Sequence, residues 1–212
     1  KDEMLEELLE EHYGQENNEA FFQLVDAFSS DRNDIQLQNI IRNLYEFSSS
    51  HPYPEQWLDE MADMYDIEEN ATIDSLPFVK ALDLHIMLQI AGAKECIEEA
   101  LQLTKQPGGP ASRAETFDKD LVLIDEIEAA SKESWQALYN KMNTLKFATL
   151  KKATGDVDEA LDEQCKKLRD KAKKSIQGLQ SELFSRKPES FLKDMKEIKA
   201  YVSMLVLLVK QF

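Results

Sequence analysis

A run of basic side chains between residues 146 and 174 is the part of this sequence that is best suited to chemistry. The stretch KFATLKKATG, residues 146–155, places lysines around one aromatic ring, Phe147. Residues 166–174 then carry six cations and a single acid, Asp170. Such cations displace counterions from a phosphate backbone without reading its sequence, and aromatic rings stack on bases. The candidate contact residues are Lys146, Lys151, Lys152, Lys166, Lys167, Arg169, Lys173 and Lys174.

A basic helix face also has a plainer explanation, because charged side chains solvate the outer surface of many helices. In a helix over 158–183, Lys166, Arg169 and Lys173 share one flank of the apolar seam, and the other lysines lie farther around. The sequence leaves both interpretations open, a phosphate-binding surface and a solvated face.

No metal site follows from the acidic and sulfur-containing residues. An EF-hand counted from Asp31 needs glycine at its sixth position and glutamate at its twelfth, which here are Gln36 and Arg42. Cys96 and Cys165 have no CxxC neighbour and no nearby histidine, and they are expected as buried thiols in a reducing cytosol.

No nucleotide site or catalytic group is expected either. The pattern GxxxxGK[ST] is missing from the sequence. The one glycine pair stands in Gln106-Pro107-Gly108-Gly109-Pro110, and we interpret it as a turn that stops a helix. No nucleophile with a matching base is found, so we assign no catalytic residue and no bound cofactor to this chain.

The elements that must position the basic residues are helices. Apolar residues recur at spacings of three and four almost throughout, and the six glycines and six prolines cluster in a few places. We expect an all-α multi-helix bundle with long antiparallel helices, about eight or nine in number, and no β-sheet. The helix over 158–183 is expected to pack antiparallel against the final helix, whose seam runs from Phe191 to Phe212.

Two further expectations concern packing near the ends of the chain. A corner at His51-Pro52-Tyr53-Pro54 breaks the helical pattern, and Phe47 and Trp57 on either side of it are expected to be substantially buried. The first and last helices are expected to be neighbours, with both ends of the chain on one side of the fold.

The net charge of −16 is unevenly distributed. Residues 1–100 carry 5 basic and 24 acidic groups, whereas residues 141–212 carry 16 and 10. We expect one helical subdomain, 1–212, with an acidic half over 1–106 and a more basic half over 107–212. It starts without methionine and is helical in pattern at both ends, as expected for a piece of a longer protein. The longest apolar run, Met204 to Val209, is far shorter than the roughly 20 residues that span a bilayer.

Three ordered strings resemble one protein family. FFQLVDAFSSDRND at 21–34, LYEFSSSHPYPEQWL at 44–58 and LTKQPGGPASRAETFDKDL at 103–121 are similar to the AddA (RexA) subunit of the bacterial AddAB helicase–nuclease. The resemblance covers nearly the whole chain. It implies the helical 1B subdomain that is inserted into the first motor domain of a UvrD/RecB-like superfamily 1 helicase.

The resemblance also implies a function for the larger protein. That protein would be a cytoplasmic ATP-dependent DNA helicase with an exonuclease domain, using ATP and Mg²⁺ that have no site in this segment. Its expected partners are double-stranded DNA ends and an AddB (RexB)-like second subunit, in double-strand break repair and recombination. Two roles remain for the segment itself: contact with duplex DNA ahead of the motor, or docking of the partner subunit without a DNA role.

Overall fold

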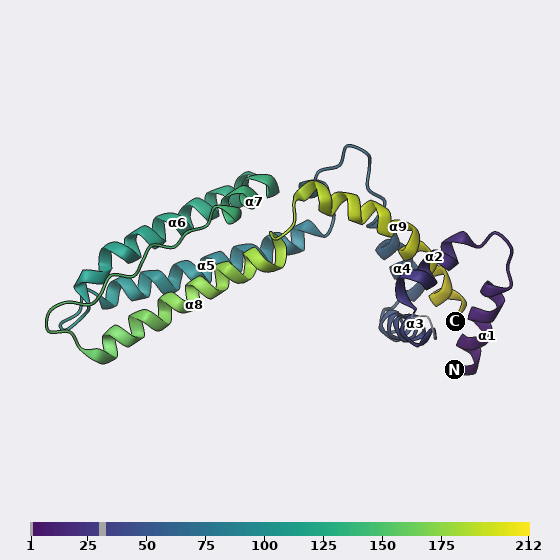
Figure 1. Ribbon diagram of the computed structural model, residues 1–212, viewed down its shortest axis with the longest axis horizontal. Coiled ribbons are helices and arrows are strands. Elements are labelled where there is room, and N and C mark those ends of the chain that lie inside the picture. Colours follow the sequence, from purple (N-terminus) through teal and green to yellow (C-terminus); the bar gives the residue numbers. More distant parts are fainter. Residues whose placement is uncertain (1, 30–32) are drawn as a thin grey trace. The chain divides into compact units, whose positions relative to one another are not determined.

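The computed structural model describes residues 2–29 and 33–212, and it confirms the all-α class. These residues form no β-strand, and two short 3₁₀ turns, Ile73–Ser75 and Ala111–Arg113, accompany the α-helices. The α-helices (Figure 1) are α1 (Asp2–Tyr13), α2 (Glu19–Phe28), α3 (Ile35–Ser48), α4 (Pro54–Asp63), α5 (Val79–Leu103), α6 (Ala114–Glu133), α7 (Trp135–Asn143), α8 (Glu159–Leu183) and α9 (Pro188–Gln211). Asp31 of the rejected calcium loop lies outside the described residues.

The chain divides into two compact units. Residues up to 71 and residues 192–212 make the terminal unit, and residues 72–191 make the central unit. The terminal unit carries 7 basic and 21 acidic side chains, whereas the central unit carries 18 and 20. The division at 106/107, where the charge balance changes along the sequence, therefore falls inside the central unit, between α5 and α6. The assignment of both units to one subdomain stays a prediction.

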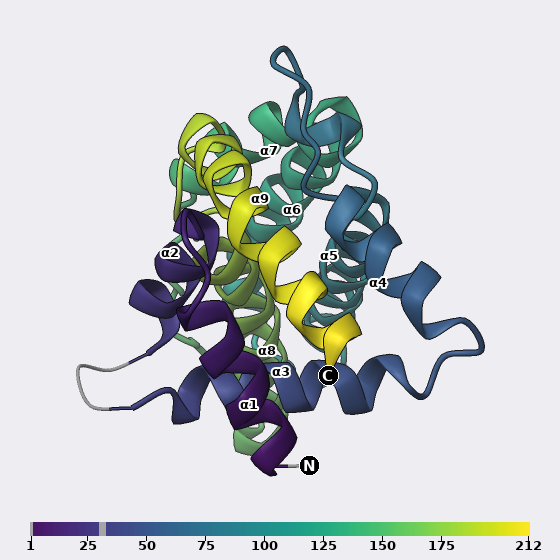
Figure 2. The ribbon, with the colours of Figure 1, turned by 90° about the vertical axis from the view of Figure 1, so that its right-hand side faces the viewer.

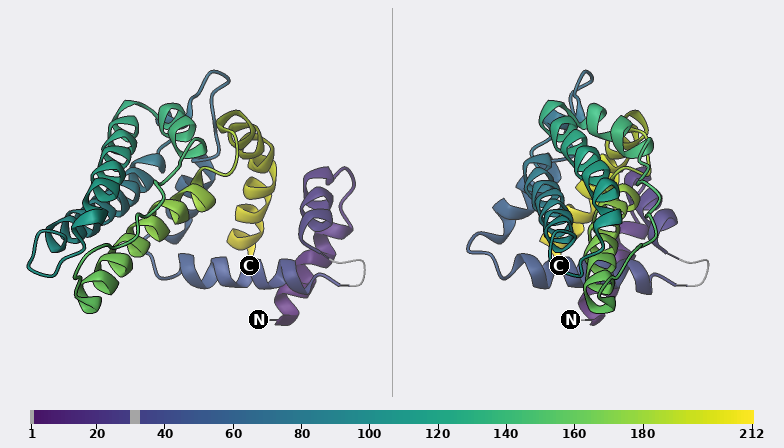
Figure 3. Two further views of the ribbon diagram at one scale, coloured as in Figure 1. Left: turned by 60° about the vertical axis from the view of Figure 1, so that its left-hand side comes forward. Right: turned by 90° about the vertical axis from the view of Figure 1, so that its left-hand side faces the viewer.

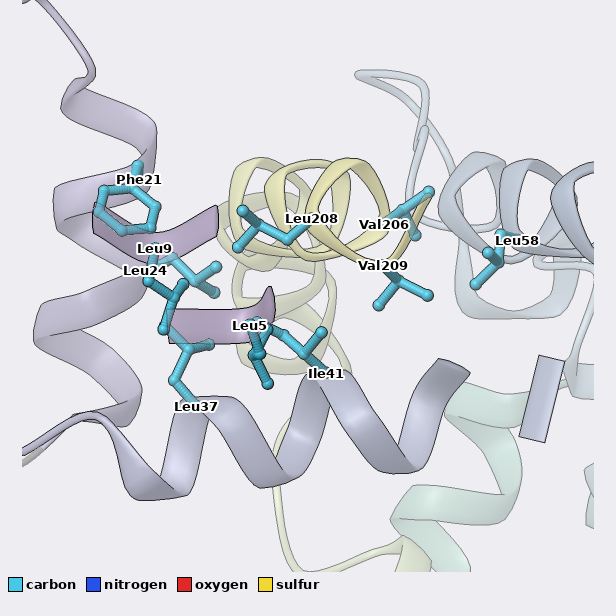
Figure 4. Close-up of a cluster of buried hydrophobic side chains, with 10 residues drawn as sticks. All are labelled: Leu5, Leu9, Phe21, Leu24, Leu37, Ile41, Leu58, Val206, Leu208 and Val209. Atoms are coloured by element: carbon cyan, nitrogen blue, oxygen red, sulfur yellow. The ribbon is translucent and has the colours of Figure 1, made fainter. Parts of the chain in front are cut away.

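The core of the terminal unit joins both ends of the sequence (Figure 4). Phe21, Leu24, Leu37 and Ile41 from α2 and α3 meet apolar residues of the first and last helices. Those residues are Leu5 and Leu9 of α1 and Val206, Leu208 and Val209 of α9. The close neighbours α1 and α9 are visible in Figure 2.

A polar contact supports the same pairing of the first and last helices. The buried ring of His12 places Nε2 2.8 Å from Oε1 of Gln211, and its other ring nitrogen lies 3.1 Å from Nδ2 of Asn18. The expected neighbourhood of the first and last helices is thus confirmed. His12 is a hydrogen-bonded residue of the core.

At the α3–α4 corner the burial expected for Phe47 is wrong. Its side chain is 60% exposed, and Trp57 is only half-buried, packed beside the core cluster. Leu37, Ile41 and Ser48 define the buried face of α3. At 100° per residue Phe47 lies roughly 80–100° away from the centre of that face, so its ring points along the surface toward Trp57.

The long helices of the central unit are α5, α6 and α8 (Figure 3). Cys165 Sγ lies 3.5 Å from the carbonyl oxygen of Ala100, and the hydroxyl of Ser175 donates to Oε1 of Gln89 at 2.6 Å. Since Cys165 precedes Ser175 while Ala100 follows Gln89, α8 runs antiparallel to α5. The expected pairing of 158–183 with the final helix is wrong, because the apolar seam of α8 is buried against α5.

Both cysteines are buried, as expected. The turn at Gly108-Gly109 is also confirmed, and it requires both glycines. Gly108 has φ +78°, and a Cβ at Gly109 would lie 2.3 Å from the carbonyl oxygen of Leu103. The amide of Asp158 donates to the carbonyl of Gly108 at 2.8 Å, which ties this turn to the start of α8. In the part of the chain that the structure describes, no helix has the length and apolarity of a membrane span.

Candidate nucleic-acid interface

The basic stretch predicted between α7 and α8 is an extended segment, residues 145–157, named the strap below. It has no regular secondary structure over residues 145–154 and runs back along α6 toward the start of α8 (Figure 1). An extended backbone has no internal hydrogen bonds, so its amide and carbonyl groups need partners elsewhere. Those partners come from one face of α6 and the turn before it.

Two hydroxyl groups hold the distal part of the strap. Ser112 Oγ donates to the carbonyl of Lys152 at 2.9 Å and accepts from the amide of Thr154 at 3.2 Å. Four residues further along, Thr116 Oγ1 accepts from the amide of Lys151 at 3.4 Å. Ser112 lies in the 3₁₀ turn Ala111–Arg113 and Thr116 in the first turn of α6, and both hydroxyls face the strap.

The third anchor continues the same spacing. Asp120 Oδ1 accepts from the amide of Ala148 at 3.3 Å. Arg169 of α8 closes the arrangement, because its Nη2 donates to the carbonyl of Ala148 at 2.5 Å. The strap is therefore bound between α6 and α8 and presents its lysines at a fixed position.

The assignment of Arg169 to DNA contact is corrected by its burial. The residue is 4% exposed, and Nε lies 2.6 Å from Oδ2 of Asp120, which is itself fully buried. Removing one member of such a pair from its low-dielectric site would leave a charge without compensation. Arg169 holds α6, α8 and the strap together and cannot reach a phosphate from this position.

A second buried ion pair, Arg113–Asp162, partly compensates the charge of another candidate, Lys166. Arg113 Nε lies 2.6 Å from Oδ1 of Asp162, and Nη2 donates to Oδ2 at 3.0 Å. Lys166 Nζ is 2.8 Å from the same carboxylate. Burial alone would raise the pKa of Asp162, but hydrogen bonds from Lys166 and Arg113 outweigh it and lower this pKa. The hydrogen bond to Asp162 in turn raises the pKa of Lys166.

The positive charge of Lys151 is compensated by a carboxylate at the surface of the strap. Its ammonium group contacts Glu115, which also pairs with Lys119 at 2.8 Å. Hydrogen bonds from Lys119 and Lys151 lower the pKa of Glu115 to about 2. A phosphate at Lys151 would have to compete with this carboxylate.

The remaining candidates are available to an anionic ligand. Lys146, Lys152, Lys167 and Lys174 are exposed, and no ion pair holds them within residues 2–29 and 33–212. Lys173 Nζ lies 5.8 Å from the ring centroid of Phe147, a cation–π contact that links α8 to the strap.

One cation of the same helix was left out of the candidate set. Lys171 is exposed on α8 and lines a groove of about 400 Å³ between α5 and α8, together with Glu95 and Glu99. Its position among carboxylates was not readable from its own helix, since Glu95 and Glu99 lie on α5. Among the described residues, no group of three or more His, Cys, Asp or Glu side chains is arranged to hold a metal ion.

Comparison with known proteins gives close relatives over the full length of the chain. It is 43% identical to the A subunit of the ATP-dependent helicase/nuclease of Bacillus cytotoxicus and 40% identical to the protein of that name from Geobacillus kaustophilus. The protein of that name from Bacillus cereus is 42% identical. Each match covers 100% of this chain, which spans 17% of the length of these relatives. No family model matches. The chain therefore corresponds, over its whole length, to a segment of the A subunit of ATP-dependent helicase/nuclease, the AddA family that its sequence resembles.

Proposed function

We propose that this chain is the helical 1B arm of an ATP-dependent helicase–nuclease and that it contacts the phosphate backbone of duplex DNA. The observation that carries the proposal is the set of exposed lysines on the strap and α8. The relatives of this chain are named for helicase and nuclease activity, which acts on nucleic acid. The arm has no catalytic residue in this proposal. It holds a basic surface for the duplex ahead of the motor.

The chemistry of the surface favours binding without sequence preference. Lysine is a flexible point charge that pairs with phosphate in many geometries, whereas the rigid guanidinium groups of Arg113 and Arg169 are engaged in buried pairs. Phe147 adds one half-buried ring beside the lysines. None of these exposed lysines can form the rigid two-point hydrogen bonds that read a base edge. Contact through the phosphate backbone of DNA is therefore the expected mode.

The proposal extends to the larger protein. It would hydrolyse ATP with Mg²⁺, carry an exonuclease domain, and process double-stranded DNA ends for break repair and recombination in the cytoplasm. An AddB (RexB)-like subunit would complete a heterodimer. ATP, Mg²⁺ and the nuclease would be held by parts of the protein other than this segment.

Docking of the second subunit remains the alternative role for this arm. The acidic terminal unit, with 7 basic and 21 acidic side chains, has the charge to attract a basic protein surface. In that case the exposed lysines of the central unit would contribute nothing to DNA binding.

The test is a matched pair of charge variants in the helicase–nuclease that contains this arm. One variant replaces Lys146, Lys152, Lys167 and Lys174 by glutamine. The control replaces four exposed lysines elsewhere, namely Lys80, Lys132, Lys187 and Lys193. Both variants lose the same net charge, and the two ion pairs that the control also loses, Lys132–Glu128 and Lys193–Glu197, are exposed pairs that contribute little. A difference in DNA affinity between the variants therefore reports location.

Duplex-end affinity is then measured across a salt series. Each lost phosphate contact reduces the slope of log affinity against log salt by about 0.9. We expect the first variant to lose up to about 3.6 units of slope, at that value for each of its four lysines, and to unwind DNA more slowly. The control should stay close to the unmodified enzyme. Equal slopes in both variants would overturn the DNA-arm proposal and favour partner docking.

A further inference from the structure

Aromatic rings gather at the α3–α4 corner outside the hydrophobic core. The ring centroids of His51 and Trp57 lie 4.5 Å apart with nearly parallel planes, and Phe47 lies 5.4 Å from Trp57 and 5.6 Å from His51. Tyr53 stands in the turn between the two helices. These four residues are named the aromatic corner below.

Much of this aromatic surface faces solvent. Phe47 is 60% exposed and Tyr53 is 73% exposed, while His51 and Trp57 are half-buried. The exposed rings contribute little to the core of the terminal unit. Clustered exposed aromatic residues are characteristic of binding surfaces, where they supply large contact area with few rotatable bonds.

The backbone of the corner is held in place by local hydrogen bonds. Ser48 and Ser49 hydroxyls donate to the carbonyl of Tyr45 at 2.9 and 2.8 Å, and the Ser50 hydroxyl donates to the carbonyl of Phe47 at 2.6 Å. The two prolines of the HPYP turn restrict the backbone that follows. A preformed surface of this kind loses little conformational entropy when a ligand binds.

The charge around the aromatic corner selects the sign of its ligand. Residues 43–71, the part of the terminal unit that holds the corner, contain no lysine or arginine and eight acidic side chains. Glu46, Glu55 and Glu60 are exposed carboxylates near the rings in sequence, and Asp59 pairs with Lys210 of α9 at 2.5 Å. Such a surface repels phosphate groups. It attracts cations, which also bind favourably to aromatic faces.

We propose that the aromatic corner binds a basic peptide segment of a protein partner, with arginine guanidinium groups stacked on its exposed rings, Phe47 and Tyr53. Arginine fits better than lysine, because its planar group stacks on a ring while its N–H groups pair with carboxylates. This site belongs to the terminal unit, whereas the exposed lysines belong to the central unit. The proposal therefore does not depend on DNA binding.

The probe is a short glycine–serine peptide that carries three arginines, compared with the same peptide carrying three lysines or three glutamates. The chain has two tryptophans, Trp57 in the corner and buried Trp135 in the central unit. Their indole N–H signals in an NMR spectrum are assigned with a Trp57→Phe variant. We expect the arginine peptide to shift the Trp57 signal and to leave that of Trp135 in place.

Variants at exposed positions then separate aromatic stacking from general charge attraction. Phe47→Ala and Tyr53→Ala should each weaken arginine-peptide binding about 3-fold, the size of a cation–π contact at a solvent-exposed site. Ile35→Ala is the matched control, because Ile35 is 56% exposed on the same helix and outside the corner. Circular dichroism checks that each variant is folded.

Three outcomes would overturn the proposal. The Phe47→Ala, Tyr53→Ala double variant could bind the peptide as well as the unmodified chain, which would leave charge alone as the cause. The lysine peptide could bind as tightly as the arginine peptide, which would exclude guanidinium stacking. A single-stranded oligothymidine that shifts the Trp57 signal while the arginine peptide does not would assign the corner to nucleic acid.

Discussion

Arg169 of α8 and Asp120 of α6 form a buried two-point contact. Nε lies 2.6 Å from Oδ2 and Nη2 lies 3.3 Å from Oδ1, and Nη2 also donates to the strap at Ala148. One guanidinium therefore connects two long helices and the extended segment between them. Its loss should affect all three elements together.

Arg169→Met should lower the free energy of unfolding by about 3–5 kcal/mol, because it leaves the carboxylate of Asp120 buried without its partner. Urea unfolding followed by circular dichroism measures the change. Lys167→Met, two residues away and exposed, is the control and should stay within about 0.5 kcal/mol of the unmodified chain. A loss for Arg169→Met as small as that of an ordinary surface substitution would show that the pair contributes little.

Thr116→Val should loosen the strap while the helices stay folded. The substitution removes the acceptor of the Lys151 amide, at a cost of about 0.5–1.5 kcal/mol. Trypsin should then cut faster after Lys151 and Lys152, because local opening exposes this backbone. Thr149→Val, at an exposed position on the strap, is the matched control. Equal cleavage rates in the two variants would argue against anchoring through Thr116.

Acid should weaken the central unit through Asp162. Lys166 and Arg113 lower its pKa in the folded state below the ordinary value of about 3.9. A lowered folded-state pKa gives stability that is present above about pH 3.9 and is lost as the pH falls through the folded-state pKa.

The measurement for Asp162 is the urea midpoint of the unmodified chain and of Asp162→Asn, followed from about pH 6 down to about pH 2.5. The variant should be less stable at the upper end of this range, because it leaves Arg113 without its charged partner. The gap between the two proteins should narrow as the pH falls below about 4. Parallel pH profiles would assign the acid sensitivity to other carboxylates.

Two glycines should respond oppositely to the same substitution. A Cβ at Gly92, inside α5, would meet no atom within 4 Å, so Gly92→Ala should stabilise the chain by roughly 1 kcal/mol through helix propensity. At Gly109 the Cβ would lie 2.3 Å from the carbonyl oxygen of Leu103, so Gly109→Ala should destabilise it. Thermal midpoints measure both. A lower midpoint for Gly92→Ala would show an unfavourable contact at that position.

At the α3–α4 corner, the exposed ring and the buried leucine should differ in their effect on stability. Leu58→Ala should cost about 2–5 kcal/mol, since Leu58 is 3% exposed within the core of the terminal unit. Phe47→Ala should cost well under that amount, because most of its ring already faces water. Urea unfolding compares the two variants, and a larger loss for Phe47→Ala would contradict the exposure of its ring.

The helices and the main turn of this protein follow from local patterns in its sequence. Apolar residues at spacings of three and four specify amphipathic helices, and the glycine pair in QPGGP specifies the turn between α5 and α6. These signals are local, since each depends on residues within one or two helical turns. The three family strings are local in the same sense, and the resemblance they carry was confirmed over the whole chain.

Which cations face solvent and which helices pair depends on contacts between distant parts of the chain. Arg169 and Lys167 are two residues apart in one basic run. Arg169 is buried and pairs with Asp120, which lies 49 positions earlier in the chain, whereas Lys167 is exposed. The apolar seam of α8 is compatible with more than one antiparallel partner. The pattern also allowed the final helix, but in the structure the partner is α5. Helical periodicity fixes which face of a helix is buried, whereas its partner depends on contacts between residues that are far apart in the chain.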